Sequence, residues 1–201
     1  MRKFLTNPLI RAVPVALVLA YSGCVTSSPY QTDAAHPIQT ITISRDVSMP
    51  QNMTFSGFSQ MMAGMLFGVA GVLATVFREG GDYHVPEMVR DELTTALTKT
   101  GKFKIISSGQ ADAEVQIRVR EYGFVQGGFM QRRVKPILTM ETLMVRRDGT
   151  QIWKSGVAIN QKTDGTPSIL PEELKANPKL AADSLHTAAR IWAAKTAESL
   201  K

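Results

Sequence analysis

A short apolar segment near the start of the chain constrains what the remainder can fold into more than any other feature. The segment, VPVALVLAYSGC, runs from Val13 to Cys24 and follows the basic residues Arg2, Lys3 and Arg11. A basic start, a short apolar core and a small-residue exit are typical of a cleaved export signal, whereas a membrane-spanning helix needs about 20 apolar residues. We therefore expect residues 1–23 to be removed and the mature chain to fold after export.

The end of this segment carries a second pattern. Ser22 and Gly23 precede the only cysteine of the chain, Cys24, and Tyr21 stands before them. This pattern resembles the lipobox of bacterial lipoproteins. The resemblance implies that the Cys24 thiol receives a diacylglycerol, that the peptide bond before it is cut, and that the new amino terminus is acylated. Because Val25 rather than aspartate follows, it also implies an outer-membrane location on the periplasmic face.

The alternative is a cut nearby by the ordinary signal peptidase, which would leave Cys24 as a free thiol. An unpaired cysteine is unfavourable in an oxidising compartment, and the chain has no second cysteine with which to form a disulfide. Three acyl chains, in contrast, exceed the two signals that stable membrane anchoring needs. Lipidation of Cys24 is therefore the hypothesis that we carry forward.

The charge of the chain is smaller than the composition suggests. The formal net charge of +6 includes three basic residues of the signal segment, and without them 20 basic and 17 acidic residues remain, a net charge of +3. This value, together with export, removes the support for nucleic-acid binding. The 201 residues less a signal of 23 suffice for one domain with its own core.

The mature chain divides into a tether and a domain. Residues 24–37 contain the acylated cysteine and a stretch rich in Ser, Thr, Pro and Gln without apolar period, which predicts a flexible tether with a reach on the order of 40 Å. Residues 38–201 are predicted to form a single periplasmic domain. Its first strand is expected from Ile38 to Val47, where β-branched residues are frequent.

An uncharged apolar segment, residues 55–77, follows this strand. As a helix it would be about 34 Å long, enough to cross a bilayer core. Its small residues Gly57, Gly64, Gly68 and Gly71 fall on one helix face, and Gly64 and Gly68 have the GxxxG spacing used between membrane helices. One interpretation is a buried core helix or helical hairpin. The other is a membrane-inserted element that self-associates through this glycine face, which would favour the inner membrane if the segment spans.

The remaining pattern predicts an α+β fold. A helix is expected from Val85 to Gly101, with an apolar stripe of Val85, Val89, Leu93 and Leu97, and a second from Pro178 to Leu200. Between them we expect a short strand at 103–107 and a meander of strands at 113–125, 137–147 and 151–160, with a hairpin turn at Asp148-Gly149. The prediction is a mostly antiparallel sheet of four to five strands packed against two or three helices.

Three stretches of this domain resemble periplasmic lipoprotein domains of the curli-secretion and TolB amino-terminal type. They are VRDELTTALTKTGKFKIIS, ADAEVQIRVREYGFV and GTQIWKSG, and the similarity covers roughly residues 85–157. The resemblance implies a small α+β domain, a role as one part of an envelope assembly, and no catalytic residues.

The candidates for chemistry are few. Glu121 and Glu141 would form a carboxylate pair if they faced one another across neighbouring strands, although two exposed strand carboxylates explain them as well. The three histidines, His36, His84 and His186, lack the spacing of a zinc site, so we expect no metal and no cofactor beyond the acyl chains. A basic loop with Arg132, Arg133 and Lys135 is a possible binding site for sugars or acidic lipid headgroups.

These observations lead to a non-enzymatic hypothesis. We expect a membrane-anchored envelope lipoprotein that acts as a binding, scaffold or accessory subunit, with the membrane and one or more envelope proteins as its partners and homo-oligomerisation possible. The alternative hypothesis is a membrane-inserted, self-associating protein that uses the glycine face of residues 55–77. A glycan-processing enzyme using Glu121 or Glu141 is the third hypothesis.

Overall fold

The computed structural model describes residues 27–31, 33–51, 53–56, 83–107, 109–126, 133–177 and 179–200. These residues form an α+β domain, as the sequence predicts. Its elements in chain order are β1 (Thr40–Ser48), β2 (Thr54–Ser56), α3 (Val85–Thr100), β3 (Lys104–Ile105), β4 (Ala113–Gln126), β5 (Val134–Arg146), β6 (Gln151–Ile159), α4 (Pro171–Ala176) and α5 (Lys179–Glu198).

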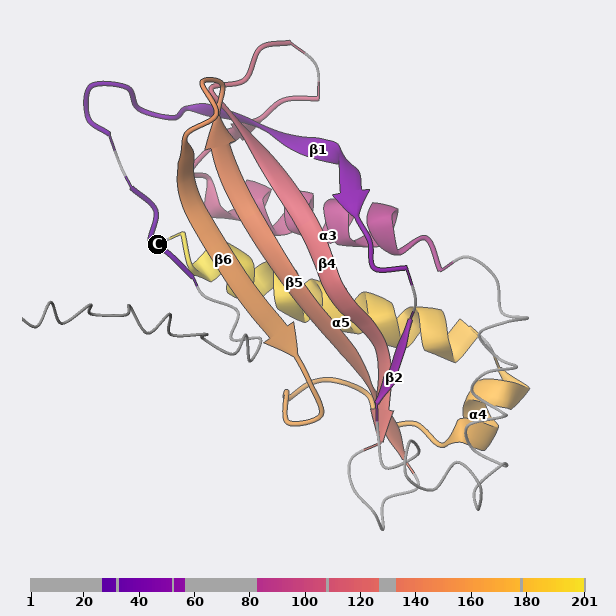
Figure 1. The fold of residues 1–201 in the computed structure, drawn as a ribbon. Helices are drawn as coiled ribbons and strands as arrows, with labels where there is room; N and C mark the ends of the chain where they lie inside the picture. The colour runs from indigo at the N-terminus through magenta and orange to yellow at the C-terminus, as the bar shows by residue number, and fades with distance from the viewer. Residues whose placement is uncertain are drawn as a thin grey trace, which may run out of the picture.

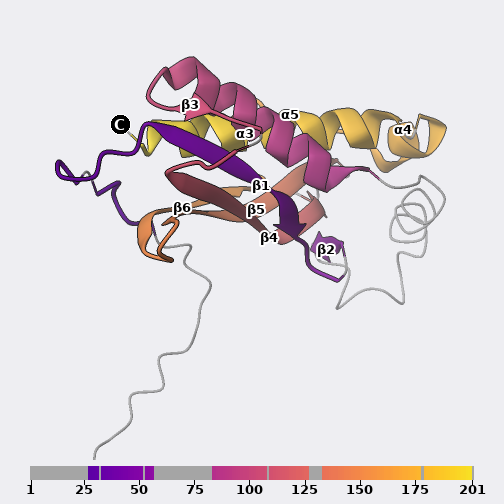
Figure 2. The same ribbon diagram turned by 90° about the horizontal axis from the view of Figure 1, so that it is seen from above.

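The strands form one mixed sheet in the order β3-β1-β4-β5-β6, and β2 pairs with the far end of β4. The long strands β4, β5 and β6 make the predicted antiparallel meander, whereas β1, β2 and β3 join the sheet by parallel pairing. Helices α3 and α5 lie side by side over one face of this sheet (Figures 1 and 2). No helix that the structure describes covers the other face, which we call the uncovered face.

Helix α3 has the boundaries that its sequence predicts. Pro86 lies in the first turn and the helix ends at Gly101, whose φ of 64° is left-handed and whose amide donates to the Thr98 carbonyl at 3.1 Å. Glycine adopts this conformation without the steric cost that a Cβ brings. The buried residues of α3 are those of the predicted stripe: Val85, Val89, Leu93 and Leu97.

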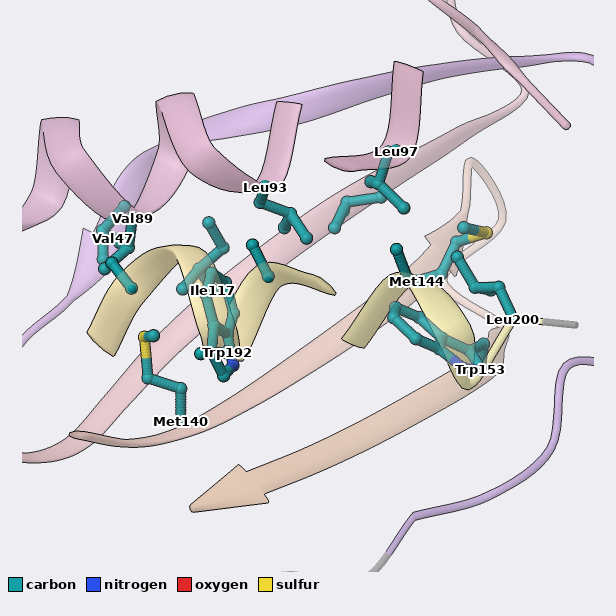
Figure 3. Close-up of a cluster of buried hydrophobic side chains, with 14 of the residues drawn as sticks. Val47, Val89, Leu93, Leu97, Ile117, Met140, Met144, Trp153, Trp192 and Leu200 are labelled. Atoms are coloured by element: carbon teal, nitrogen blue, oxygen red, sulfur yellow. The ribbon is translucent and has the colours of Figure 1, made fainter. Parts of the chain in front are cut away.

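The core lies between the helices and the sheet. Figure 3 shows Val89, Leu93 and Leu97 of α3 directed towards the layer that holds Trp192 of α5 and Ile117 of β4. A second, smaller cluster lies at the α4 end of the domain and contains Phe124, Val134, Ile169, Leu174, Ala181 and Leu185. Of the helices in the described ranges, none combines the length and the apolar composition that a bilayer span requires.

The hairpin turn after β5 was predicted from the sequence, whereas a short helix near residue 171 was not. The turn after β5 forms as expected, with Gly149 at a φ of 88° and the Arg146 amide donating to the Thr150 carbonyl at 2.8 Å. The short helix α4 was not predicted. Its signal is Pro171 in the first turn together with Glu173, whose carboxylate accepts from the Leu170 amide at 2.8 Å.

Residues 27–31, which the sequence predicts as part of the flexible tether, lie along the outer edge of β6, and we call them the strap. The Ser28 amide donates to the Lys154 carbonyl at 2.8 Å, and the Gln31 amide donates to the Ile152 carbonyl at 3.1 Å. The Gly156 amide donates to the Ser27 hydroxyl at 3.1 Å. The tether prediction is therefore wrong for these residues, because the unpaired backbone groups of an edge strand give even a polar segment hydrogen-bond partners.

Tyr30 connects the strap to the helix layer. Its ring packs edge-on against Phe103 with centroids 5.7 Å apart, and the Lys102 ammonium lies 5.0 Å from its centroid. The same ammonium donates to the carbonyl of Leu200, just beyond the end of α5. The strap is thus held by β6 and by the turn after α3, whose Lys102 also contacts the residue after α5.

We expect Tyr30→Ala to cost about 1 kcal/mol of unfolding free energy, because it removes one aromatic pair and one cation–π contact. The Gly156 amide should then exchange with solvent faster, which hydrogen exchange followed by NMR would measure. Tyr30→Phe, which keeps the ring, should leave both quantities near their original values. Unchanged exchange at Gly156 in Tyr30→Ala would show that the ring does not hold the strap.

Candidate functional site

A groove of about 870 Å³ lies between the C-terminal halves of α3 and α5. Both helices end on the same side of the domain, since Glu92 of α3 lies 3.3 Å from His186 of α5 while Lys102, just after α3, reaches Leu200 after α5. The residues that line the groove come from these two helices and the turns that follow them: Glu92, Thr95, Ala96, Lys99, Thr100, Lys102, Arg190, Ala194, Ala197, Glu198 and Leu200.

The alanine content of α5 explains how this groove is built. On its inner face Ala188, Ala189 and Ala193 are buried, so α5 approaches both the sheet and α3 closely. On the groove side, the apolar lining, which we call the floor, consists of Ala96 of α3, Ala194 and Ala197 of α5, and Leu200 after it. Small residues at a helix contact therefore produce a shallow apolar floor between two polar walls.

The walls of the groove carry both signs of charge. Lys99, Lys102 and Arg190 are cationic, whereas Glu92 and Glu198 are anionic. The C-terminal ends of both helices add partial negative charge at one end of the groove, and the Lys102 ammonium is bonded to a carbonyl there. Amines, a guanidinium and carboxylates around an apolar floor are suited to a peptide segment that carries charges of both signs.

A second cluster lies on the uncovered face of the sheet, where the Glu141 carboxylate is almost fully buried. Its oxygens accept from the Arg120 guanidinium at 2.5 Å and from the Lys154 ammonium. Burial raises the pKa of Glu141, but the hydrogen bonds from Lys154 and Arg120 outweigh it and hold this pKa below its usual value. Glu141 is therefore an ionised partner of two cations.

Glu121 and Glu141 do not face one another. Thr139 lies opposite Glu121, with its hydroxyl 3.5 Å from that carboxylate, while Arg118 lies opposite Glu141. The register shifts at a bulge between Val119 and Glu121. One extra residue in a strand moves every later side chain along its partner, which a sequence pattern does not reveal.

The candidate basic loop is only partly described, since Arg132 lies outside the described residues. The Arg133 guanidinium donates twice to the Ser168 carbonyl, at 3.1 and 3.0 Å, and lies 3.8 Å from the Glu173 carboxylate. It therefore fastens the loop before α4 to the start of β5. Lys135 lies within β5, opposite Val125.

Several predicted site residues lie outside the described part of the chain. They are the acylation site Cys24 and the glycines of the proposed packing face: Gly57, Gly64, Gly68 and Gly71. The three histidines are described, and they lie apart: His36 between the strap and β1, His84 before α3, and His186 on α5. The described ranges hold no group of three or more His, Cys, Asp or Glu side chains placed to hold a metal ion.

Sequence reasoning missed both the groove and the Glu141 cluster. The groove depends on which faces of two separate helices meet, and periodicity reports the buried face of each helix but not its neighbour. In the Glu141 cluster, Arg120, Glu141 and Lys154 come from three different strands, and the register of these strands shifts at bulges. The only available signal was the presence of charged residues within three otherwise apolar strands.

Comparison with known proteins gives structural likenesses only. No family model matches this sequence, and a search of the curated proteins finds no match. The solved structures with a similar arrangement include protein XCC0632 of Xanthomonas campestris, described under the family label DUF330, with a TM-score of 0.47, 12% identity, and coverage of 84% of this chain and 90% of that chain.

Two further similar structures carry descriptive names. A PelC dodecamer from Paraburkholderia phytofirmans has a TM-score of 0.46 at 11% identity, with coverage of 89% of this chain and 98% of that chain. A minor lipoprotein of Acinetobacter baumannii has a TM-score of 0.32 at 11% identity, with coverage of 80% and 94%. A bacterial lipoprotein is thus among the similar structures, and the function proposed next rests on the residues of this chain.

Proposed function

We propose that this protein is a lipid-anchored component of the bacterial cell envelope whose domain acts by binding, as a scaffold or accessory subunit of an envelope assembly. The observation that carries the proposal is the order of features along the chain. An export segment ends in Ser22-Gly23-Cys24, and Ser27, Ser28 and Gln31, shortly after it, hydrogen-bond to β6. The anchor and the domain therefore form one continuous unit.

The proposed anchor is a diacylglycerol on the Cys24 thiol and an acyl chain on its amino group. Three chains exceed what stable attachment needs, because each buried methylene contributes about 0.8 kcal/mol. With Val25 after the cysteine, the expected location is the outer membrane, facing the periplasm.

The proposed mode of action is recognition rather than catalysis. The groove between α3 and α5 offers a floor that includes Ala96 and Ala194 and charged walls that include Lys99 and Arg190. Such a surface binds a protein segment through apolar contact on the floor and charge complementarity at the walls. On the uncovered face, Glu141 is neutralised by two cations, and this favours a stabilising role for it over proton transfer.

Metabolic labelling with palmitate tests the anchor. We expect the label to enter the natural protein and to be absent from Cys24→Ala, which should leave the membrane fraction. Val25→Ala is the matched control and should be labelled normally, since it keeps the cysteine and the residues before it. Equal labelling of Cys24→Ala and the natural protein would refute the proposal.

Crosslinking in intact envelopes, read by mass spectrometry, tests the groove. Arg190→Glu reverses a charge on a groove wall and should reduce partner recovery at least tenfold. Lys179→Glu makes the same reversal outside the groove, at the opposite end of α5, and should recover the partner as the natural protein does. Equal recovery from both variants would exclude the groove as the binding surface.

Self-association through residues 55–77 is the second candidate function. Met53 and Tyr83, the described residues on either side of positions 57–82, pack against the same small cluster. If the segment between Met53 and Tyr83 entered a membrane, both of its ends would therefore lie on the same side of the bilayer. It would then have to cross the bilayer twice, and two crossings need about 40 helical residues. This favours an oligomer contact over a full span. Gly68→Leu should then abolish an oligomer seen on native gels, with Gly80→Leu as the control.

A further inference from the structure

We infer that a defined surface of the domain rests on the lipid headgroups, namely the rim formed by the strap, β6 and the C-terminal end of α5. This inference rests on the proposed acylation of Cys24. It deepens that proposal by naming which part of the protein meets the membrane.

The chain that leads from the proposed anchor joins the domain at strand β6. Ser27 accepts a hydrogen bond from the Gly156 amide at 3.1 Å, and Ser28 pairs with Lys154. The chain therefore reaches the domain at the middle of β6, on the edge of the sheet. Parts of the domain that lie close to this edge are therefore close to the lipid, and parts far from this edge are far from the lipid.

The connection between Cys24 and the domain is short. Cys24 and Ser27 are three residues apart, and consecutive Cα atoms lie about 3.8 Å apart, so the connection spans at most about 11 Å. A tether that ended at residue 37 would reach about four times as far. With so short a connection, the rim stays at the membrane interface whenever the acyl chains are inserted.

The shape of the domain decides which parts lie near the membrane and which do not. Tyr30, Lys102 and Leu200 join the strap to the end of α5, so this helix end belongs to the rim. Figures 1 and 2 both show α4 and the start of α5 at the end of the domain away from the strap. The 20 residues of α5 separate its two ends by about 30 Å.

The chemistry of the rim suits phospholipid headgroups. Lys195 in the last turn of α5 and Lys102, which lies beside the end of this helix, are exposed. Ammonium groups bind phosphate oxygens, and basic side chains near an anionic lipid surface strengthen the attraction of the protein to it. The groove between the C-terminal halves of α3 and α5 lies at this end, so a partner bound there would also lie close to the membrane.

Single fluorescent labels on the lipidated full-length protein test the orientation. Once Cys24 is acylated, an introduced cysteine is the only free thiol, and Lys195→Cys and Lys179→Cys form a matched pair on one helix, with 16 residues and about 24 Å between them. In vesicles of phosphatidylethanolamine and phosphatidylglycerol with a headgroup nitroxide lipid, the label at position 195 should be quenched at least threefold more strongly. Ala158→Cys on β6 is a second rim position and should behave like Lys195→Cys.

Equal quenching at positions 195 and 179, or stronger quenching at 179, would overturn the inference. Inserting 20 Gly and Ser residues between Thr26 and Ser27 should abolish the difference, and its full persistence would also overturn the role assigned to the short connection. Palmitate labelling of the same preparations separates the two proposals. Protein without the label refutes the anchor, whereas labelled protein with equal quenching refutes only the orientation.

Discussion

Replacing Gly123 with alanine is expected to lower the unfolding free energy by about 3 kcal/mol. Gly123 lies in β4 opposite Thr54 of β2 and has a φ of 146°. A Cβ at this position would lie 1.9 Å from the Thr54 carbonyl oxygen and 3.1 Å from Cγ of Met53. Because the obstacle is backbone, β2 must move away from β4.

Gly149→Ala is the matched control for this experiment. Gly149 also has a positive φ, 88°, but a Cβ there meets nothing within 4 Å. Its cost should be the conformational strain alone, about 1 kcal/mol. Urea unfolding of both variants separates close approach from strain, and hydrogen exchange at residues 54–56 should accelerate only in Gly123→Ala. Equal costs for both substitutions would show that β2 does not lie against Gly123.

Glu141→Gln is expected to cost about 2 kcal/mol at neutral pH. The substitution removes the charge that compensates Lys154 and Arg120, while the amide keeps the size of the side chain. Charge-assisted hydrogen bonds contribute about 1.5–3 kcal/mol each when buried, and the 57% exposure of the Arg120 side chain reduces its share. The Lys154 side chain is 27% exposed and should contribute more.

The pH dependence of this cost has a definite sign. Since the pKa of Glu141 is lower in the folded state, its contribution is fully present above the unfolded value of about 4.3 and is lost as the pH falls through the folded value. The difference in unfolding free energy between the natural protein and Glu141→Gln should therefore shrink below about pH 4. Other carboxylates titrate in both proteins and cancel in the difference.

Glu121→Gln is the control for the carboxylate at position 141. Glu121 lies on the same face but opposite Thr139, so its replacement should cost less than about 0.5 kcal/mol and should not alter the pH dependence. A cost that is equal at positions 121 and 141, or one that does not change with pH, would contradict the ion-pair cluster.

Part of the fold follows from local sequence pattern. The stripe from Val85 to Leu97 and the stop at Gly101 are contained within one helix, and the Asp148-Gly149 turn depends on four adjacent residues. These features need no information about distant segments, because helix periodicity and turn conformation arise from neighbouring residues. The α+β class followed from their order along the chain.

The candidate sites did not follow from local pattern. Glu141 meets Arg120 and Lys154 only because three strands pair in one register, and in this register Glu121 lies opposite Thr139. The groove exists only because α3 and α5, separated by the whole meander, end on the same side of the sheet. Both arrangements depend on contacts between residues far apart in the chain.

The first 30 residues show most directly which features follow from local sequence and which depend on tertiary structure. Basic, apolar and small residues in succession are enough to predict an export segment and acylation at Cys24, since cellular machinery reads such a segment in extended or helical form without its tertiary context. Composition alone predicts a tether for the residues that follow, because Ser, Thr and Pro offer no apolar face. Only tertiary structure provides the open edge of β6, which pairs with Ser28 and limits the connection between the predicted acylation site and the domain to at most about 11 Å.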